Sequence, residues 1–380
     1  TDVSKVKGLT VPKITEATTE DMARNNPRLT RDEMFEFIFQ DLNDAETLLK
    51  DNSHTAGKDV PSLAVVYGLK ARAYLWLGGF DDGLNGELPA GNDAYRLAAE
   101  YANKALAECG GAVLTEAEWT NVTTGFNTKA SSWMWYLQHS TDTVYNNLIQ
   151  FPAHMAPEAS YGYCPFTQPG VSAATYEMLG DNDFRKKLIV GPNTTYADYK
   201  DVTDLTADEW TTFGLEGKGM RTYCHLKFRT HGEKVSATTG NVVDIPIMRV
   251  EEMYFIEAEA TAHYDAATGK ALITSFMTSF RDPKYTIGAG LDLVEEIIFQ
   301  KRCEFWGEGV LFYDFKRLDM GIDNAYDGTN APAGADFETK GRCPAWNMCI
   351  PHAETQQNNA LDGKNNPDPS MTLKPKSEAA

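Results

Sequence analysis

The stretch KRCEFWGEGVLFYDFKRLDMG, residues 301–321, places aromatic rings among acidic and basic side chains, next to two glycines that flank a glutamate. The preceding residues, from 291 to 309, have helical periodicity, so the glycines indicate the end of a helix. This mixture of side chains is typical either of an active centre or of an internal clamp of ion pairs. Burying a carboxylate without a partner is costly, which favours the clamp.

Carboxylates at helical spacing supply the acidic half of such a clamp. Glu252 and Glu259 are seven residues apart, and Glu304 and Glu308 are four apart, so each pair lies on one helix face. The basic partners that we expect for these carboxylates are Arg249, Arg302, Lys316 and Arg317. The same pairs leave a second interpretation open, a glycoside hydrolase, because that chemistry needs only two carboxylates.

The composition bounds the class of protein. The chain has 380 residues, 42% of them hydrophobic and 11% aromatic, which is enough for a large buried core. With 35 basic against 54 acidic residues the net charge is −19, which argues against a nucleic-acid partner because such binding depends on lysine and arginine. The longest apolar runs are too short to cross a bilayer. The chain begins at Thr1 without a methionine or a signal-peptide pattern, so we expect that the true N-terminus is missing.

Helical periodicity dominates the chain outside its middle third. Residues 29–50 form an amphipathic pattern that Thr30 and Glu33 begin as a capping box. Residues 62–80 and 94–109 are rich in alanine and aromatic residues and predict a tetratricopeptide-type helical hairpin. A second hairpin is predicted at 248–281, followed by the helix that includes the opening stretch. The predicted fold is therefore mostly α, a helical scaffold that carries a long insertion.

The insertion differs from the helical segments in composition. It is rich in Thr, Asn, Gly, Tyr and Trp and predicts loops and short strands, with one helical piece at 172–188. In SSWMWYLQHS, residues 131–140, strict alternation would put Trp133 and Trp135 on one strand face. We divide the single domain into four parts: the first part of the helical scaffold at 1–110, the insertion at 111–245, the second part of the scaffold at 246–321, and a turn-rich wrap and tail at 322–380.

Motifs for cofactor or metal chemistry are missing. The chain has no H-E-x-x-H, G-x-S-x-G or P-loop pattern, and its seven histidines are scattered, so we expect no metal and no cofactor. The loop with Asp81, Asp82, Asn85 and Glu87 carries oxygen ligands suited to calcium, but it lacks the EF-hand spacing and is interpreted first as a solvated turn. Most of the six cysteines are expected to be buried thiols, with a bridge between Cys343 and Cys349 left open.

Exposed aromatic residues are the candidate ligand contacts. Sugar rings stack on the faces of tryptophan and tyrosine, while side-chain amides form hydrogen bonds with the sugar hydroxyls. The insertion supplies such residues, and for any single one the interpretation as core remains open: Trp119, Trp133, Trp135, Tyr145, Asn146, Asn147, Tyr161, Tyr163 and Phe166.

Three segments together resemble signatures of the SusD/RagB family of nutrient-binding lipoproteins of Bacteroidetes. IPIMRVEEMYFIEAEA, residues 245–260, contains an arginine, a glutamate three residues later and an A-E-A triplet. IIFQKRCEFWGEGVLFYDFKRLDMG, residues 297–321, resembles the second signature, and WNMCIPHAETQQNNAL, residues 346–361, resembles the closing I-P-x-x-E motif. The residues that match are Arg249, Glu252, Glu259, Arg302, Glu304, Glu308, Gly309, Asp314, Arg317, Ile350, Pro351, Glu354 and Asn358 or Asn359. Gln300 and Lys301 depart from the usual Glu-Arg, and Leu311 stands where an arginine is common.

The resemblance implies a fold, a role and a clamp. It implies a non-enzymatic protein that captures an oligosaccharide or peptide and passes it to a SusC-like TonB-dependent transporter, on the cell-surface side of the outer membrane. The lipid anchor that would attach it lies outside this sequence. It also implies that the charged signature residues are scaffold, with Glu252, Glu259, Arg302 and Arg317 as the clamp and with Phe312 and Phe315 folded back onto the helix. Arg302→Ala should then lower the melting temperature without changing ligand affinity. A glycoside hydrolase and a helical scaffold that binds only protein are the alternatives.

Overall fold

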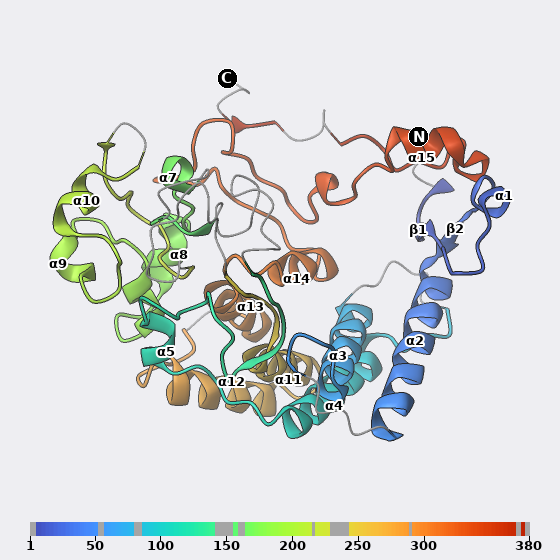
Figure 1. Cartoon of the computed structure of the whole chain (residues 1–380), viewed down its shortest axis with the longest axis horizontal. Coiled ribbons are helices and arrows are strands. Elements are labelled where there is room, and N and C mark those ends of the chain that lie inside the picture. The colour runs from blue at the N-terminus through green and yellow to red at the C-terminus, as the bar shows by residue number, and fades with distance from the viewer. Residues whose placement is uncertain are drawn as a thin grey trace.

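Helices form one layer of the molecule, and irregular chain covers it. The computed structural model describes residues 5–51, 57–79, 86–140, 155–158, 164–214, 217–228, 243–288, 291–369 and 374–376. Figure 1 shows the helical layer at the bottom, the insertion at the left, and the C-terminal segment crossing above both toward the N-terminal strands. None of the helices in these ranges is long and apolar enough to span a membrane.

The first hairpin begins with α2 (Arg31–Asp51) and continues with α3 (Leu63–Gly79) and α4 (Gly91–Cys109). The predicted capping box is confirmed: Thr30 and Glu33 exchange hydrogen bonds at the start of α2, with 2.8 Å between Thr30 N and Glu33 Oε2. Alanines on the buried face of α4 let α3 approach closely, and a Cβ atom at Gly78 would lie 2.6 Å from the ring of Tyr95. Gly78 is therefore needed for helix packing.

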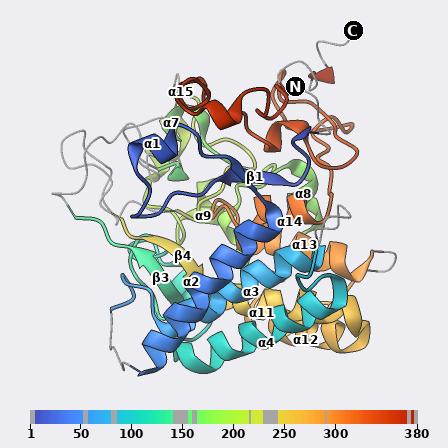
Figure 2. The same ribbon diagram turned by 90° about the vertical axis from the view of Figure 1, so that its right-hand side faces the viewer.

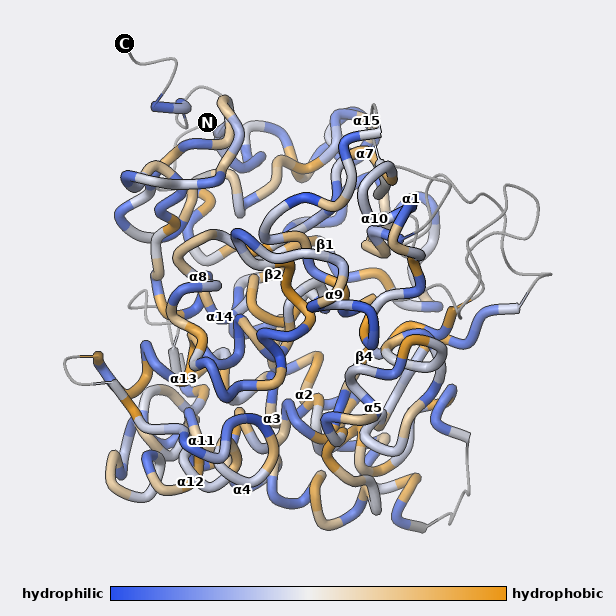
Figure 3. The backbone as a smooth tube through the Cα atoms, turned by 90° about the vertical axis from the view of Figure 1, so that its left-hand side faces the viewer, coloured by the Kyte–Doolittle hydropathy of each residue, from blue (hydrophilic) through white to orange (hydrophobic). Residues whose placement is uncertain are grey.

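The second hairpin consists of α11 (Val250–Tyr264) and α12 (Ala266–Phe280), joined by a single residue, Asp265. It is followed by α13 (Leu293–Glu304) and by the short α14 (Leu311–Arg317). Figure 2 shows α2, α3, α4, α11 and α12 side by side in one layer, and α4 packs directly on α11. The prediction of a mostly α, tetratricopeptide-like scaffold is thus confirmed. Figure 3 colours the backbone by hydropathy and shows hydrophobic and hydrophilic residues interspersed along the chain.

The insertion is anchored to the scaffold by a two-stranded antiparallel sheet of β3 (Trp133–Leu137) and β4 (Ile245–Arg249). Strict alternation is wrong for β3, because the register shifts between Trp133 and Tyr136. As a result Trp133 and Tyr136 join the core of the insertion, while Met134 and Trp135 pack against the core of the scaffold. The predicted single helix at 172–188 is instead α8 (Ala173–Met178) followed by a short 3-10 helix, Phe184–Leu188.

The remaining elements are short. The insertion contains α5 (Glu116–Thr120), α7 (Cys164–Thr167), α9 (Tyr196–Tyr199) and α10 (Ala207–Thr212). The N-terminal segment forms β1 (Leu9–Pro12), α1 (Glu20–Ala23) and β2 (Arg28–Thr30), with β1 antiparallel to β2. The C-terminal segment carries 3-10 turns at Pro344–Trp346 and Asn359–Leu361 and the helix α15 (His352–Gln357).

The opening stretch contributes to two buried ion clusters that hold the scaffold together. In the first, Glu304 is fully buried and accepts hydrogen bonds from Arg281 at 2.8 and 2.9 Å. Arg249 and Arg185 approach the same carboxylate at 3.3 and 3.2 Å. Burial raises the pKa of Glu304, but the three guanidinium groups outweigh this and hold that pKa far below its ordinary value.

The two glycines of the opening stretch place Glu308 in this first cluster. Gly307 and Gly309 have φ angles of 76° and 78°, a left-handed conformation that glycine adopts without strain. The turn that they form after α13 directs Glu308 to Arg249, at 2.8 and 2.9 Å, and to the amine of Lys227. The turn therefore completes an internal ion cluster.

The second cluster joins α11, α13 and α14. Arg317 binds both Glu259 and Asp314, and Lys301 lies 3.1 Å from Glu259 and 2.6 Å from Asp314. All four side chains are buried. Two cations thus face two carboxylates between the three helices.

Two of the expected clamp residues have other partners. Glu252 binds Arg72 of α3, with 2.6 Å to both Nε and Nη2, and Arg72 also donates to the carbonyl oxygen of Ile247 at 2.7 Å, so this arginine fastens α11 and β4 to the first hairpin. Arg302 forms no ion pair with any described residue. Its guanidinium lies 5.3 Å from the ring centre of Phe315, and burial lowers its pKa. The expectation that Arg302 belongs to the clamp is wrong, because Lys301, one residue earlier, faces the carboxylates.

Two aromatic residues of the opening stretch differ in burial. Phe315 is buried as expected, but Phe312 is 42% exposed and packs toward Trp346 instead of folding back onto α13.

Candidate ligand-binding pocket

A pocket of about 1380 Å³ lies where the two ends of the described chain meet. Its walls are the strands β1 and β2 and the first turn of α2 on one side, and residues from the C-terminal segment on the other. Trp76 of α3 and Lys316 of α14 line it as well. Small-molecule pockets usually span roughly 300–1,000 Å³, so this one has room for an extended ligand.

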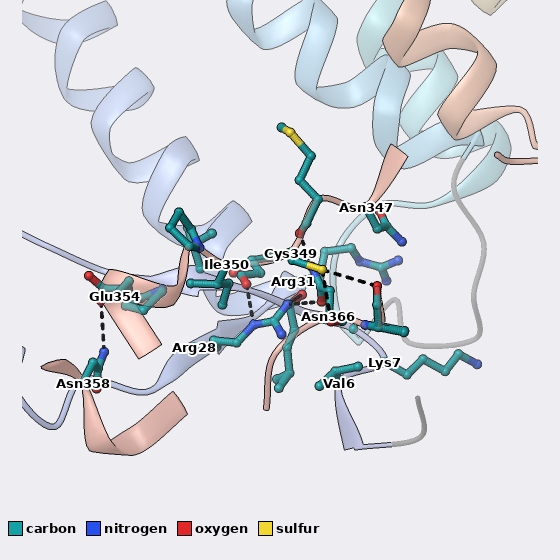
Figure 4. A pocket seen from close by; sticks show the side chains of 18 of the residues that line it. Val6, Lys7, Arg28, Arg31, Asn347, Cys349, Ile350, Glu354, Asn358 and Asn366 are labelled. Atoms are coloured by element: carbon teal, nitrogen blue, oxygen red, sulfur yellow. Dashed lines mark hydrogen bonds between the residues drawn. The ribbon is translucent and has the colours of Figure 1, made fainter. Parts of the chain in front are cut away.

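Asparagine side chains join the C-terminal wall to the N-terminal segment and hold the C-terminal wall itself in shape. Asn358 exchanges hydrogen bonds with the backbone of Asn26, at 3.0 and 2.7 Å. Asn365 does the same with the backbone of Ile350, at 2.7 and 3.0 Å, and Asn366 donates to the carbonyl oxygen of Met348 at 2.9 Å. The closing motif of the sequence, with Ile350, Glu354 and Asn358, therefore forms a wall of the pocket, as Figure 4 shows.

Arg28 fastens the floor of the pocket. Its guanidinium donates to the carbonyl oxygens of Thr10, Leu9 and Lys364 at 2.7–2.8 Å and to the side-chain oxygen of Asn366 at 3.0 Å. In Figure 4 Arg28 lies beside Asn366 and Cys349 near the centre, whereas Lys7 extends away from them. Two of these bonds, to Lys364 and Asn366, join chain segments more than 330 residues apart and so fix the two walls of the pocket relative to each other.

A row of aromatic rings runs from one pocket-lining residue to another. The ring of Trp76 lies 6.4 Å from that of Tyr313, Tyr313 lies 5.4 Å from Phe312, and Phe312 lies 5.7 Å from Trp346. Phe312 and Tyr313 are 42% and 60% exposed. We call these four residues the aromatic row. It offers apolar ring surface beside amides and charged groups, the combination that sugar recognition uses.

The sequence-predicted ligand residues are not gathered in this pocket. Trp119 and Trp133 are fully buried in the core of the insertion, so neither exposes a ring face on which a ligand stacks. Trp135 is half-buried against the scaffold core, and Phe166 is 49% exposed on α7. Tyr145, Asn146, Asn147, Tyr161 and Tyr163 lie outside the described residues.

The predictions about metals and cysteines have mixed outcomes. No group of three or more His, Cys, Asp or Glu side chains in the described ranges is arranged to hold a metal ion. Of the calcium-loop residues, Asp81, Asp82 and Asn85 lie outside those ranges, and Glu87 is exposed. Cys343 and Cys349 are free thiols, the first buried and the second exposed, so the bridge considered between them is not formed.

The pocket and the aromatic row were missed from sequence alone. Their residues come from positions 6–35, 76, 312–316 and 342–369, and local periodicity does not show that these segments meet. The available signals were the run of asparagines and prolines after the closing motif and the mixture of exposed aromatics in the opening stretch.

Comparison with known proteins identifies the family. The model of the SusD family matches residues 165–368, more than half of the chain. The chain therefore belongs to the SusD family. A comparison with curated proteins finds none that matches the sequence significantly.

Solved structures share the fold. A SusD-like carbohydrate-binding protein from Bacteroides vulgatus is 22% identical with a TM-score of 0.65, and the match covers 96% of this chain and 72% of that one. A second SusD superfamily protein from Bacteroides vulgatus is 19% identical with a TM-score of 0.68, covering 96% and 71%. A protein solved with a xylogluco-oligosaccharide is 16% identical with a TM-score of 0.61, covering 94% and 76%. At these identities the likeness shows the fold.

Proposed function

We propose that this protein binds an oligosaccharide in the pocket between its N-terminal strands and its C-terminal segment, with the aromatic row as the stacking surface. The observation that carries the proposal is the aromatic row itself, which is partly exposed and begins and ends at residues that line the pocket. Family membership and the sugar-binding description of one structural relative support it.

The buried carboxylates support binding rather than catalysis. A glycoside hydrolase needs one carboxylic acid whose pKa is raised so that it can donate a proton. Glu304 and Glu308 have the opposite property, because neighbouring cations offset the effect of burial and lower the pKa of each. Of the pocket carboxylates, Glu20 is paired with Arg24. A non-enzymatic binding protein is therefore the function that we propose.

The test is titration calorimetry of the protein with a panel of plant and host oligosaccharides, followed by the best ligand with two variants. Trp346→Ala removes one end of the aromatic row, and Phe166→Ala removes the exposed ring of the insertion. We expect Trp346→Ala to weaken binding about ten- to a hundredfold, since aromatic contacts of this kind contribute roughly 1–3 kcal/mol. Loss of binding in Phe166→Ala with full binding in Trp346→Ala would place the ligand on the insertion instead.

We further propose that the bound ligand passes to a SusC-like TonB-dependent transporter, and that the protein acts at the cell surface, held by a lipid anchor on the outer membrane. Family membership supports this role. Isolation of the native full-length protein from outer membranes, with mass spectrometry of its partners, tests it. We expect a large β-barrel protein in stoichiometric amount. A peptide-binding protein would instead retain peptides on isolation and would bind none of the oligosaccharides in the calorimetry panel.

A further inference from the structure

The charges that line the pocket differ in sign from the chain as a whole. Among the described residues, six cationic side chains line it, against three carboxylates. The cations are Lys7, Arg24, Arg28, Arg31, Lys316 and Arg342, and the carboxylates are Glu20, Glu354 and Asp368. The protein carries a net charge of −19, so a cationic pocket is a local arrangement and not a consequence of composition.

Several of these cations have carboxylate partners within the protein. Arg24 is paired with Glu20, Arg31 lies 3.8 Å from Asp32, and Arg342 lies 3.9 Å from Asp319. Asp319 is 70% exposed, so water screens its interaction with Arg342. Arg28 is different, because all of its hydrogen-bond acceptors are neutral oxygens, although the residue is only 8% exposed.

Two of the cations that line the pocket, Lys316 and Arg342, are held next to each other. The guanidinium of Arg342 donates from Nε to the backbone carbonyl of Lys316, and the amine of Lys316 donates to the carbonyl oxygen of Trp346 at 3.1 Å. Lys316 Nζ also lies 5.8 Å from the ring centre of Phe312. Burial and the neighbouring charge of Arg342 lower the pKa of Lys316. An anionic group beside these two cations would relieve their repulsion.

We propose that the pocket selects an anionic glycan, one that carries carboxylate or sulfate groups, and that Lys316 and Arg342 receive this charge while the sugar ring stacks on Trp346. This inference rests on the proposed oligosaccharide-binding function and names its substrate class. Lys316 uses one of its three N–H groups for Trp346, so two remain for a ligand. Because Lys316 contacts the backbone of Trp346 and the backbone of Lys316 contacts Arg342, the ring and the charge of one sugar unit would find adjacent contacts.

The test uses matched pairs of glycans that differ only in charge. Oligogalacturonides are compared with their methyl esters, and chondroitin sulfate oligosaccharides with the chemically desulfated, carboxyl-reduced form, by calorimetry with the full chain. We expect the charged member of a pair to bind at least tenfold more tightly and its affinity to fall with added salt. Preference within the first pair indicates a carboxylate. Preference confined to the second pair indicates a sulfate if it persists against chondroitin that is desulfated but keeps its carboxylates.

Variants assign the charge recognition to its residues. Lys316→Met should weaken binding of the charged glycan about ten- to a hundredfold, the effect of one charge-assisted hydrogen bond, and Lys316→Arg should restore much of it. Lys187→Met is the matched control, because Lys187 is 61% exposed and pairs with Glu116 away from the pocket. Urea denaturation of each variant establishes that it is folded.

The outcomes separate this inference from the proposed function. Equal or tighter binding of the neutral member of each pair would overturn the inference and leave oligosaccharide binding intact. If Lys316→Met and Arg342→Met bind the charged glycan as tightly as the wild type does, the assignment of charge recognition to these two residues is overturned. Failure to bind any glycan, charged or neutral, would overturn the proposed function together with the inference.

Discussion

Substitution of two adjacent residues on α13 distinguishes the clamp seen in the structure from the one expected from sequence. Lys301 is 1% exposed, and its amine lies between Glu259 and Asp314. Lys301→Met keeps an unbranched apolar chain but leaves two buried carboxylates to share Arg317. Removing one partner of a buried pair costs about 3–5 kcal/mol, and because Arg317 remains, we expect about 3 kcal/mol.

Arg302→Met is the matched control at the next position. The Arg302 guanidinium faces the ring of Phe315 and no described carboxylate, so its removal should cost under about 1 kcal/mol, the value of an isolated cation–π contact. Urea denaturation followed by circular dichroism measures both effects. With a slope of about 3 kcal/mol per molar urea, Lys301→Met should lower the midpoint by about 1 M and Arg302→Met by less than about 0.3 M. Equal losses, or a larger loss in Arg302→Met, would refute the assignment of the clamp to Lys301.

Three further predictions test the scaffold. Gly78→Ala puts a Cβ atom 2.6 Å from the ring of Tyr95 and should destabilise the protein by about 1–3 kcal/mol in urea denaturation. Gly288→Ala is the control, because its Cβ atom would lie 3.6 Å from Leu291 and the substitution should be close to neutral; equal effects would contradict the packing argument. Burial lowers the pKa of Lys227 to about 8, against about 10.4 in an unfolded chain. Between these two pKa values the unfolded state binds more protons than the folded state. The contribution of Lys227 to the free energy of unfolding therefore increases as the pH rises through this range. The stability advantage of the wild type over Lys227→Met should therefore grow from pH 8 to 10. A constant difference in urea midpoint over this pH range would contradict the lowered pKa of Lys227. The pKa of Glu308 is lowered in the folded state, so its contribution to stability is complete above its unfolded pKa of about 4.3 and is lost at lower pH. Glu308→Gln should therefore lose less stability than the wild type on acidification, measured as urea midpoints from pH 6 to 3. The same dependence of the urea midpoint on pH in both proteins would count against the cluster.

Local features were predictable because their causes are local. The capping box of Thr30 and Glu33 needs only two residues three positions apart, and the helices around it follow from apolar spacing. The close packing of α3 on α4 was also accessible, since the alanines at one face of 94–109 are visible in the sequence. These features needed no knowledge of the rest of the chain.

Features that depend on long-range contacts were not predictable. Adjacent residues on a helix differ by about 100° in direction, so the choice between Lys301 and Arg302 requires knowing where α11 and α14 lie. The irregular register of β3 moved Trp135 away from Trp133, and it depends on pairing with a strand more than 100 residues later. The partner of Glu252, Arg72 on α3, lies 180 residues earlier in the sequence.

The candidate site shows the same limit. The aromatic row comes from the opening stretch and from residues 76 and 346, but only the folded chain places these rings at a pocket whose other wall begins at residue 6. The insertion drew attention in the sequence because it is rich in tryptophan, and three of those tryptophans, Trp119, Trp133 and Trp210, are core residues. Aromatic composition therefore locates a core as readily as a ligand surface.

A crystal structure of the protein with the tightest-binding oligosaccharide of the panel tests the central claim most directly. The account predicts sugar density in the pocket, with a ring stacked on Trp346 or Trp76 and the polar groups of the sugar near Lys316 and the asparagines of the C-terminal segment. Density over α7 and the insertion, with the aromatic row left bare, would contradict it.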